Sequence, residues 1–319
     1  MLEGAPMFLD NESLKNRVLL ATFPRTGNSF LRQYFEQITN IVTGSDMDFS
    51  LTQEVGLNGF KGEAYIDDRV WIQKTHHPMD TYHIGQSKGN RLISTIRNPL
   101  DTVVSCYELF CTDLQSYCFP DQYYEEKRDH FWKFAQSNLI AYLQHTKSLI
   151  KECQDEGVQL YFIRYEDLLE NPSKTLHYLF KFLINVDDIE GTLLQSRIEK
   201  AITKMNNGQQ AIYKVQKKGI NKHRQKFTQE MIDWISKELH WFNHFFGYTK
   251  IKSKVENCFD IFQYEEEDCS SEIHLQFLDH NKMAIQQSQG QDFDKWFTTY
   301  RPEHIIDYII EFQGFIGLP

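Results

Sequence analysis

The stretch that most constrains the fold is residues 22–30, which read TFPRTGNSF. An apolar, β-prone run at 18–21 precedes it. After it, apolar residues recur with helical spacing, at Phe30, Leu31, Tyr34, Phe35 and Ile38. The stretch is therefore predicted to be a tight turn that leads from a strand into a helix.

A turn of this kind can bind an anion. The first N–H groups of a helix have no intrahelical partner, and the helix dipole creates positive potential there. Gly27 allows a close approach of the backbone to a ligand, Thr26 and Ser29 add hydroxyl groups, and Arg25 adds a charge suited to phosphate or sulfate oxygens. The alternative is a helix start capped by Asn28 or Ser29, with no ligand. A Walker A loop is excluded, because the segment has one glycine and no Lys before Ser29.

A second predicted strand, at 70–75, leads into KTHHP at 74–78. Histidine titrates near neutral pH, so His76 is suited to accept a proton from an acceptor hydroxyl. Two adjacent histidines in a loop are also typical of solvated or capping residues. The segment on its own leaves both interpretations open.

A third predicted strand, at 91–97, is apolar enough to lie in a buried parallel sheet. It continues into RNPLDTVVS at 97–105, where Pro99 is predicted to open a helix. Arg97 and Ser105 can reach one phosphate only if this helix folds back beside the strand. The alternative is a capped helix start that follows a strand and binds nothing.

Taken together and in this order, the motifs resemble those of the sulfotransferases that use 3′-phosphoadenylyl sulfate (PAPS), and are nearest to cytosolic-type members. In that family a 5′-phosphosulfate loop corresponds to 22–30, a KTHxP segment to 74–78, a 3′-phosphate motif to 97–105 and a KKG loop to 217–219. The resemblance covers about residues 17–248. It implies transfer of a sulfonate group from PAPS to a hydroxyl or amine acceptor, with no metal ion.

The resemblance also implies roles for individual residues. His76 is expected to be the catalytic base and Lys74 the assisting cation, while Arg25 balances charge on the transferring group in place of the family's usual Lys. His77 occupies a variable position and is expected to be structural or to line the pocket. The residues expected to bind the donor are Arg25, Thr26, Gly27, Asn28, Ser29, Phe30, Arg97, Ser105, Tyr165, Lys217, Lys218 and Gly219.

A buried strand at 158–165 ends in the YEDL motif that begins with Tyr165. By the same resemblance, Tyr165 is expected to lie near the adenine of the donor, on which Phe30 could stack. Glu166 and Asp167 are expected to cap a helix or to pair with nearby Arg and Lys residues.

The expected fold is α/β: a three-layer sandwich with a central parallel β-sheet flanked by helices, and a P-loop-like strand–turn–helix phosphate site. Residues 42–69 and 111–129 are expected to border the substrate pocket, although the aromatic residues of 111–129 could equally pack in the core. Residues 229–245 are expected to form the last core helix. The domain is expected to span 1–249, followed by an acidic extension of unknown role at 250–319.

The charge and cysteine content narrow the class of protein. A formal net charge of -10 is unsuited to coating nucleic acid or an anionic membrane. The six Cys show no zinc-binding spacing and are expected to be reduced thiols of a cytoplasmic protein. No apolar run approaches the ~18 residues of a membrane span. The family's dimerisation motif is degraded at 224–233, which leaves the oligomeric state open.

Two rival functions stay open on the sequence. One is a P-loop nucleotide kinase or NTPase, and the other is a non-catalytic nucleotide-binding scaffold protein. The missing Walker A Lys argues against the first, and the presence of Lys74 and His76 argues against the second. The acceptor, whether a small molecule or another hydroxyl compound, has no readable code in the sequence.

Overall fold

A five-stranded parallel sheet lies at the centre of the computed structural model, which describes residues 5–9, 17–47, 59–77, 89–112, 117–207 and 223–248. The strand order is β2-β3-β1-β4-β5, and every neighbouring pair is parallel. Because the strands are parallel, all of their carboxyl ends lie at one edge. The strands are β1 (Val18–Ala21), β2 (Gly44–Ser45), β3 (Ile72–Thr75), β4 (Arg91–Ile96) and β5 (Gln159–Arg164).

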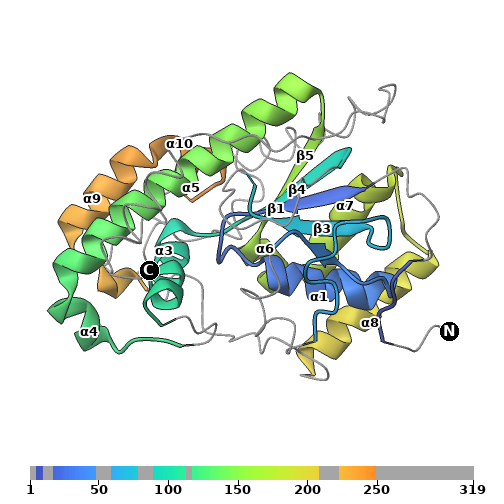
Figure 1. Cartoon of the computed structure of the whole chain (residues 1–319), viewed down its shortest axis with the longest axis horizontal. Helices are drawn as coiled ribbons and strands as arrows, with labels where there is room; N and C mark the ends of the chain where they lie inside the picture. Colours follow the sequence, from blue (N-terminus) through green and yellow to red (C-terminus); the bar gives the residue numbers. More distant parts are fainter. Residues whose placement is uncertain are drawn as a thin grey trace.

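Helices cover both faces of this sheet (Figure 1). Those on one face are α1 (Asn28–Thr39), α6 (Tyr165–Glu170), α7 (Pro172–Ile184) and α8 (Leu193–Asn206). Those on the other are α3 (Pro99–Thr112), α4 (Asp121–Glu126), α5 (Arg128–Glu156), α9 (Gln229–Glu238) and α10 (His240–Phe245). A short 3-10 helix, η2 (Arg224–Lys226), precedes α9.

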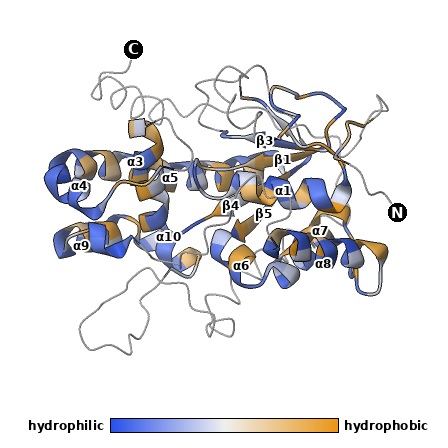
Figure 2. Ribbon diagram, turned by 90° about the horizontal axis from the view of Figure 1, so that it is seen from below, coloured by the Kyte–Doolittle hydropathy of each residue, from blue (hydrophilic) through white to orange (hydrophobic). Residues whose placement is uncertain are grey.

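The two faces of the sheet build two hydrophobic cores. Along β1 the side chains alternate: Leu19 and Ala21 join the core under α3 and α5, whereas Val18 and Leu20 join the core under α1 and α7. In Figure 2 the covering helices carry both hydrophobic and hydrophilic residues, as expected for helices with one face in a core. The predicted three-layer α/β class is confirmed.

The predicted strand–turn–helix units are confirmed at their expected places. Helix α1 begins at Asn28 and ends at Thr39, directly after the turn that follows β1. Pro99 opens α3, as predicted, and α3 extends to Thr112. The sheet also contains a short strand that the sequence did not reveal, because β2 lies inside the glycine-containing segment at 42–69.

One other expectation is corrected. The last core helix is two helices, α9 and α10, which meet at the fully buried Leu239. This break directs Phe242 and Phe246 onto Tyr142 and Phe162, at ring distances of 4.8 and 4.9 Å. Tertiary packing therefore overrode a continuous helical pattern.

The described part of the segment at 111–129 contains helix α4, and its place at the substrate pocket stays a prediction. Its aromatic residues pack against one another: the rings of Phe119 and Tyr123 stack 3.9 Å apart, and Tyr124 is buried. Core packing is thus the better description of Tyr124, whereas Tyr117 is exposed. The acidic extension at 250–319 lies outside the described residues, and the proposed division at 249 stays a prediction.

Candidate active site

The turn between β1 and α1 has an unusual backbone. Arg25 and Gly27 both adopt positive φ angles, 67° and 108°, and the N–H of Leu31 makes the first helical bond to the Gly27 carbonyl at 3.0 Å. No side chain caps the helix, and its first turn contains no acidic residue. The earlier N–H groups of α1 therefore form a positive pole suited to an anion.

The polar side chains of the turn bond to the protein itself. Asn28 donates to the Thr22 hydroxyl at 3.1 Å, and Ser29 donates to the Asn28 side-chain oxygen at 3.0 Å, so neither residue caps α1. The buried Thr26 hydroxyl donates to the Phe23 carbonyl at 2.7 Å and lies 2.8 Å from the Thr95 hydroxyl. These hydrogen bonds hold the turn in shape.

The residues that were predicted to bind phosphate groups meet at this turn. The Arg25 Nε donates to the Ser105 hydroxyl at 2.9 Å, and the Arg97 Nη1 donates to the Arg25 carbonyl at 3.0 Å. Helix α3 therefore does fold back beside β4, which was the condition for a shared site. The Arg97 Nε is buried without a hydrogen-bond partner among the described residues.

Tyr165 forms the wall behind the turn. A Cβ placed on Gly27 would lie 2.5 Å from the Tyr165 ring, so only glycine fits there. The Arg97 guanidinium lies 4.8 Å from the centre of the Tyr165 ring. The rings of Phe30 and Tyr165 pack edge to face, with their centres 5.9 Å apart. Gly27, Phe30, Arg97 and Tyr165 are thus brought into one neighbourhood, as the sequence predicted.

His76 lies directly after β3, next to the start of the same turn. Its Nδ1 lies 2.7 Å from the Thr22 carbonyl oxygen. A carbonyl can only accept, so neutral His76 carries its proton on Nδ1 and its basic lone pair on Nε2. That tautomer is the one a general base with an oriented ring requires.

The neighbouring His77 points elsewhere. It is buried, and its Nε2 donates to a Glu152 oxygen on α5 at 2.6 Å. Its backbone N–H donates to the Thr75 hydroxyl at 2.9 Å. This places His77 in a structural contact between the His76 loop and α5, in keeping with the expectation for it.

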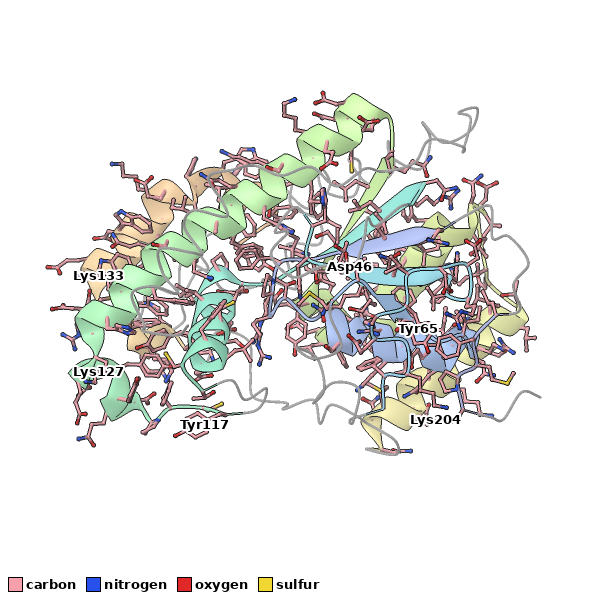
Figure 3. The ribbon with its side chains drawn as sticks, in the orientation of Figure 1. Asp46, Tyr65, Tyr117, Lys127, Lys133 and Lys204 are labelled. Carbon is pink, nitrogen blue, oxygen red and sulfur yellow. The ribbon has the colours of Figure 1, made fainter. Side chains whose placement is uncertain are left out.

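Lys74 is almost fully buried near the β2 edge of the sheet. Burial lowers the pKa of Lys74, and the negative charges of Glu63 and Asp46 act in the opposite direction. Figure 3 shows Asp46 in the middle of the molecule, whereas Tyr117, Lys127 and Lys133 lie at the α4 end. Sequence reasoning did not find Glu63 or Asp46, because both come from the segment that showed little periodicity.

The buried Glu166 accepts two hydrogen bonds. Its Oε1 accepts the Asn98 N–H at 2.8 Å, and its Oε2 accepts the Tyr248 hydroxyl at 2.7 Å. Burial raises the pKa of Glu166 to about 7. Asp167 does pair with an arginine, Arg164, at 2.8 Å, as predicted.

Three donor-binding candidates, Lys217, Lys218 and Gly219, lie outside the described residues and stay predictions. Within the part of the chain that the structure describes, no cluster of three or more His, Cys, Asp or Glu residues could hold a metal ion. In the same part, no helix is both long and apolar enough to cross a membrane.

The fold and the site together define an α/β protein with a turn at the carboxyl edge of a parallel sheet whose geometry is suited to an anion. The family model described as "Sulfotransferase domain" matches residues 15–241. The chain therefore belongs to the sulfotransferase domain family, as its motifs predicted.

Curated relatives carry the name WSCD family member. The one from Aedes aegypti is 30% identical over 167 residues, which are 51% of this chain and 49% of the relative. The one from Drosophila melanogaster is 25% identical over 174 residues, 54% of this chain and 51% of the relative. The chain thus spans about half the length of the curated relatives it matches.

Similar solved structures include mouse sulfotransferase SULT7A1 complexed with PAP, at 15% identity and a TM-score of 0.46, over 72% of this chain and 85% of that one. Another is retinol dehydratase in complex with androsterone and inactive cofactor PAP, at 14% identity and a TM-score of 0.46, over 78% of this chain and 85% of that one.

Proposed function

We propose that this chain transfers a sulfonate group from PAPS to a hydroxyl or amine acceptor, with His76 as the general base. The observation that carries the proposal is the convergence of three separate strand ends on one turn. His76 contacts the Thr22 carbonyl after β1, Arg97 contacts the Arg25 carbonyl, and Arg25 contacts Ser105. Anion-binding groups and a base thereby share one site.

The residues fit a donor with two separate anionic ends. The uncapped start of α1 offers N–H groups for a 5′-phosphosulfate, from Thr26 to Ser29. Arg97, with its unpartnered Nε, and Ser105 suit a 3′-phosphate. Phe30 and Tyr165 supply aromatic surface for a base between the two ends.

In this proposal each residue has a limited task. His76 accepts the acceptor's proton at Nε2 while its Nδ1–H remains bonded to Thr22, which keeps the ring oriented. Lys74 and Arg25 stabilise the negative charge on the transferring group. Arg25 acts by charge and hydrogen bonds alone, because a guanidinium does not give up its proton near neutral pH.

The first experiment is a calorimetric titration of the purified chain with adenosine 3′,5′-bisphosphate (PAP), compared with ATP plus Mg²⁺. We expect clear binding of the bisphosphate and weak binding of Mg·ATP. Arg97→Met should abolish bisphosphate binding. Arg69→Met should preserve it, because Arg69 is exposed and pairs with Asp67. Preference for Mg·ATP would contradict the proposal and favour the kinase or NTPase alternative.

Binding alone does not separate an enzyme from a nucleotide-binding scaffold protein. The second experiment is therefore transfer of labelled sulfonate from PAPS to a panel of phenols, aliphatic alcohols and amines. Product formation that is lost in His76→Ala would support a catalytic function with His76 as the base. Normal bisphosphate binding with no transfer to any class of acceptor would favour the scaffold.

A further inference from the structure

Three residues from different segments form a row at the β2 edge of the sheet. Ser45 in β2 is in register with Lys74 in β3, and Ser45 is also bridged to Glu63 in the parallel direction. Residues in register on neighbouring strands project to the same face. The side chains of Glu63, Ser45 and Lys74, hereafter the Glu63 row, therefore lie side by side on one face.

The segment that carries Glu63 is docked tightly onto this edge. The Ser45 N–H donates to the Gly62 carbonyl at 3.0 Å, and the Asp46 N–H donates to the Lys74 carbonyl at 3.2 Å. A Cβ on Gly62 would lie 2.2 Å from the Thr43 carbonyl oxygen, so the close approach requires glycine. The position of Glu63 is thus determined by backbone contacts as well as by its side chain.

Arg32 of α1 holds the other end of Glu63. Its Nη1 lies 2.5 Å from Glu63 Oε1, and both side chains are fully buried. The same guanidinium donates to Thr43 through Nε at 2.8 Å and through Nη2 at 3.0 Å. The remaining oxygen, Glu63 Oε2, is buried and accepts no hydrogen bond from the described residues.

The charged groups that face Lys74 come from three segments. They are Glu63, Asp46 after β2, and Arg32 on α1. Burial and Arg32 lower the pKa of Lys74, whereas Glu63 and Asp46 raise it. Burial raises the pKa of Glu63, but Arg32 and Lys74 outweigh this effect and the pKa is lowered overall, so Glu63 is the anion in the row.

We propose that Glu63 is a supporting residue that keeps the Lys74 ammonium group charged for the reaction, from its place beyond Ser45 on the same face of the sheet. Glu63 itself need not touch a substrate, because it acts through Lys74. A buried ammonium without an anion tends to lose its proton, and neutral Lys74 could not stabilise a developing negative charge. The inference rests on the role of Lys74 in the proposed function.

The direct test measures Lys74 in the full chain without substrates. Lysines labelled with ¹³C at Cε are titrated by NMR, and the Lys74 signal is assigned by its loss in Lys74→Arg. In Glu63→Gln we expect the Lys74 titration midpoint to fall by about one pH unit or more. An unchanged midpoint would overturn the inference, whatever the activity of the protein.

The matched control is Glu36→Gln. Glu36 belongs to the same buried network and accepts from the Thr43 N–H and hydroxyl at 2.9 and 2.7 Å, but it is not among the charges that face Lys74. It should lower the melting temperature without moving the Lys74 midpoint. If Glu63→Gln does not fold, Asp46→Asn tests the same idea, because it leaves the Arg32–Glu63 pair in place. Asp46→Asn should lower the midpoint by a smaller amount, and no shift would again overturn the inference.

The second test is the pH profile of sulfonate transfer with any acceptor found in the screen. Lys74 must be protonated, so its pKa sets the alkaline limit of activity. Glu63→Gln should move that alkaline limit to lower pH by about one unit. At a pH above the limits of both the unchanged protein and the variant, kcat of the variant should therefore be about tenfold lower. In a Lys74→Arg background the same substitution should not move the limit, because Arg stays charged.

The two proposals fail in different ways. Full activity in Lys74→Met would contradict the role of Lys74 in the proposed function, even if Glu63 governs the Lys74 midpoint. Loss of activity in Lys74→Met together with an unmoved midpoint in Glu63→Gln would contradict only the inference about Glu63.

Discussion

The two regions beside β1 that each contain an arginine are built differently. On the donor side, the Arg97 guanidinium donates to a backbone carbonyl at 3.0 Å and lies over the Tyr165 ring. On the β2 side, Arg32 meets the Glu63 carboxylate at 2.5 Å. A carbonyl leaves most of a cation's charge uncompensated, whereas a carboxylate cancels it. The donor side is therefore suited to an external anion, whereas the charge of Arg32 on the β2 side is compensated within the protein.

The same contrast appears in the buried glutamates behind the two regions. Burial raises the pKa of Glu166 to about 7, since its partners are an N–H group and a hydroxyl. For Glu63, burial is outweighed by Arg32 and Lys74, and the pKa is lowered. Glu166 thus titrates near neutral pH beside the residues predicted to bind phosphate, whereas Glu63 is a fixed negative charge.

The largest effect is expected at His76, which stands between the two regions. His76→Ala should lower kcat by about 10²–10⁴ with little change in donor affinity, because the base acts only on the acceptor's proton. Steady-state kinetics and bisphosphate calorimetry measure the two quantities. Loss of donor affinity instead would mean that His76 supports the turn through Thr22 and has no catalytic role.

The two glutamates should give opposite pH dependences of stability. Glu166 has a raised pKa, so its ionisation weakens the folded state as pH rises from about 4.5 to about 7, by about 3 kcal/mol in total. Glu166→Gln keeps the shape and removes this loss, so it should be less destabilising at pH 8 than at pH 5. Urea unfolding at both values provides the measurement.

The lowered pKa of Glu63 works in the other direction. Its stabilising contribution is present above its unfolded-state pKa and is lost as pH falls through the folded one. Glu63→Gln should therefore cost more free energy of unfolding at pH 7 than in acid. If both glutamate variants showed the same pH dependence, the contrast between the two regions would be refuted.

Gly27→Ala tests the shape of the donor side. The new Cβ would meet the Tyr165 ring at a backbone φ of +108°, and we expect a loss of about 2 kcal/mol in stability together with weaker bisphosphate binding. Gly191→Ala is the matched control, with a positive φ of +72° but open space around the new atom. If Gly27→Ala and Gly191→Ala had equal effects on the melting temperature and on bisphosphate binding, the contact with Tyr165 would be unimportant.

The smallest effect is expected from Arg25→Lys, which preserves the charge and removes the Nε bond to Ser105. We expect kcat to fall about tenfold, because an ammonium cannot reproduce the planar fork of the guanidinium. Ser105→Ala should show a smaller part of the same loss. Full kcat in Arg25→Lys would mean that charge alone matters at this position.

Much of the fold could be predicted because its signals are local. The apolar run before Thr22 and the helical spacing from Phe30 to Ile38 predicted β1 and α1, and Pro99 marked the start of α3. The order of the motifs then predicted that Arg25, Arg97 and Ser105 would meet at strand ends. Their contacts follow from the parallel sheet, which brings all of its carboxyl ends to one edge.

The sequence by itself determined the turn and the membership of the family, and the anion chemistry of the turn stays a prediction. Only the tertiary structure decided which buried charges support the site, because these contacts join residues far apart in the chain and have no local pattern. Arg32 meets Glu63 across 31 positions, and Glu166 meets Asn98 across 68. A glutamate looks the same in a sequence whether a cation, an N–H group or water will face it. Burial and its neighbours then decide whether it becomes a fixed anion or titrates near neutral pH.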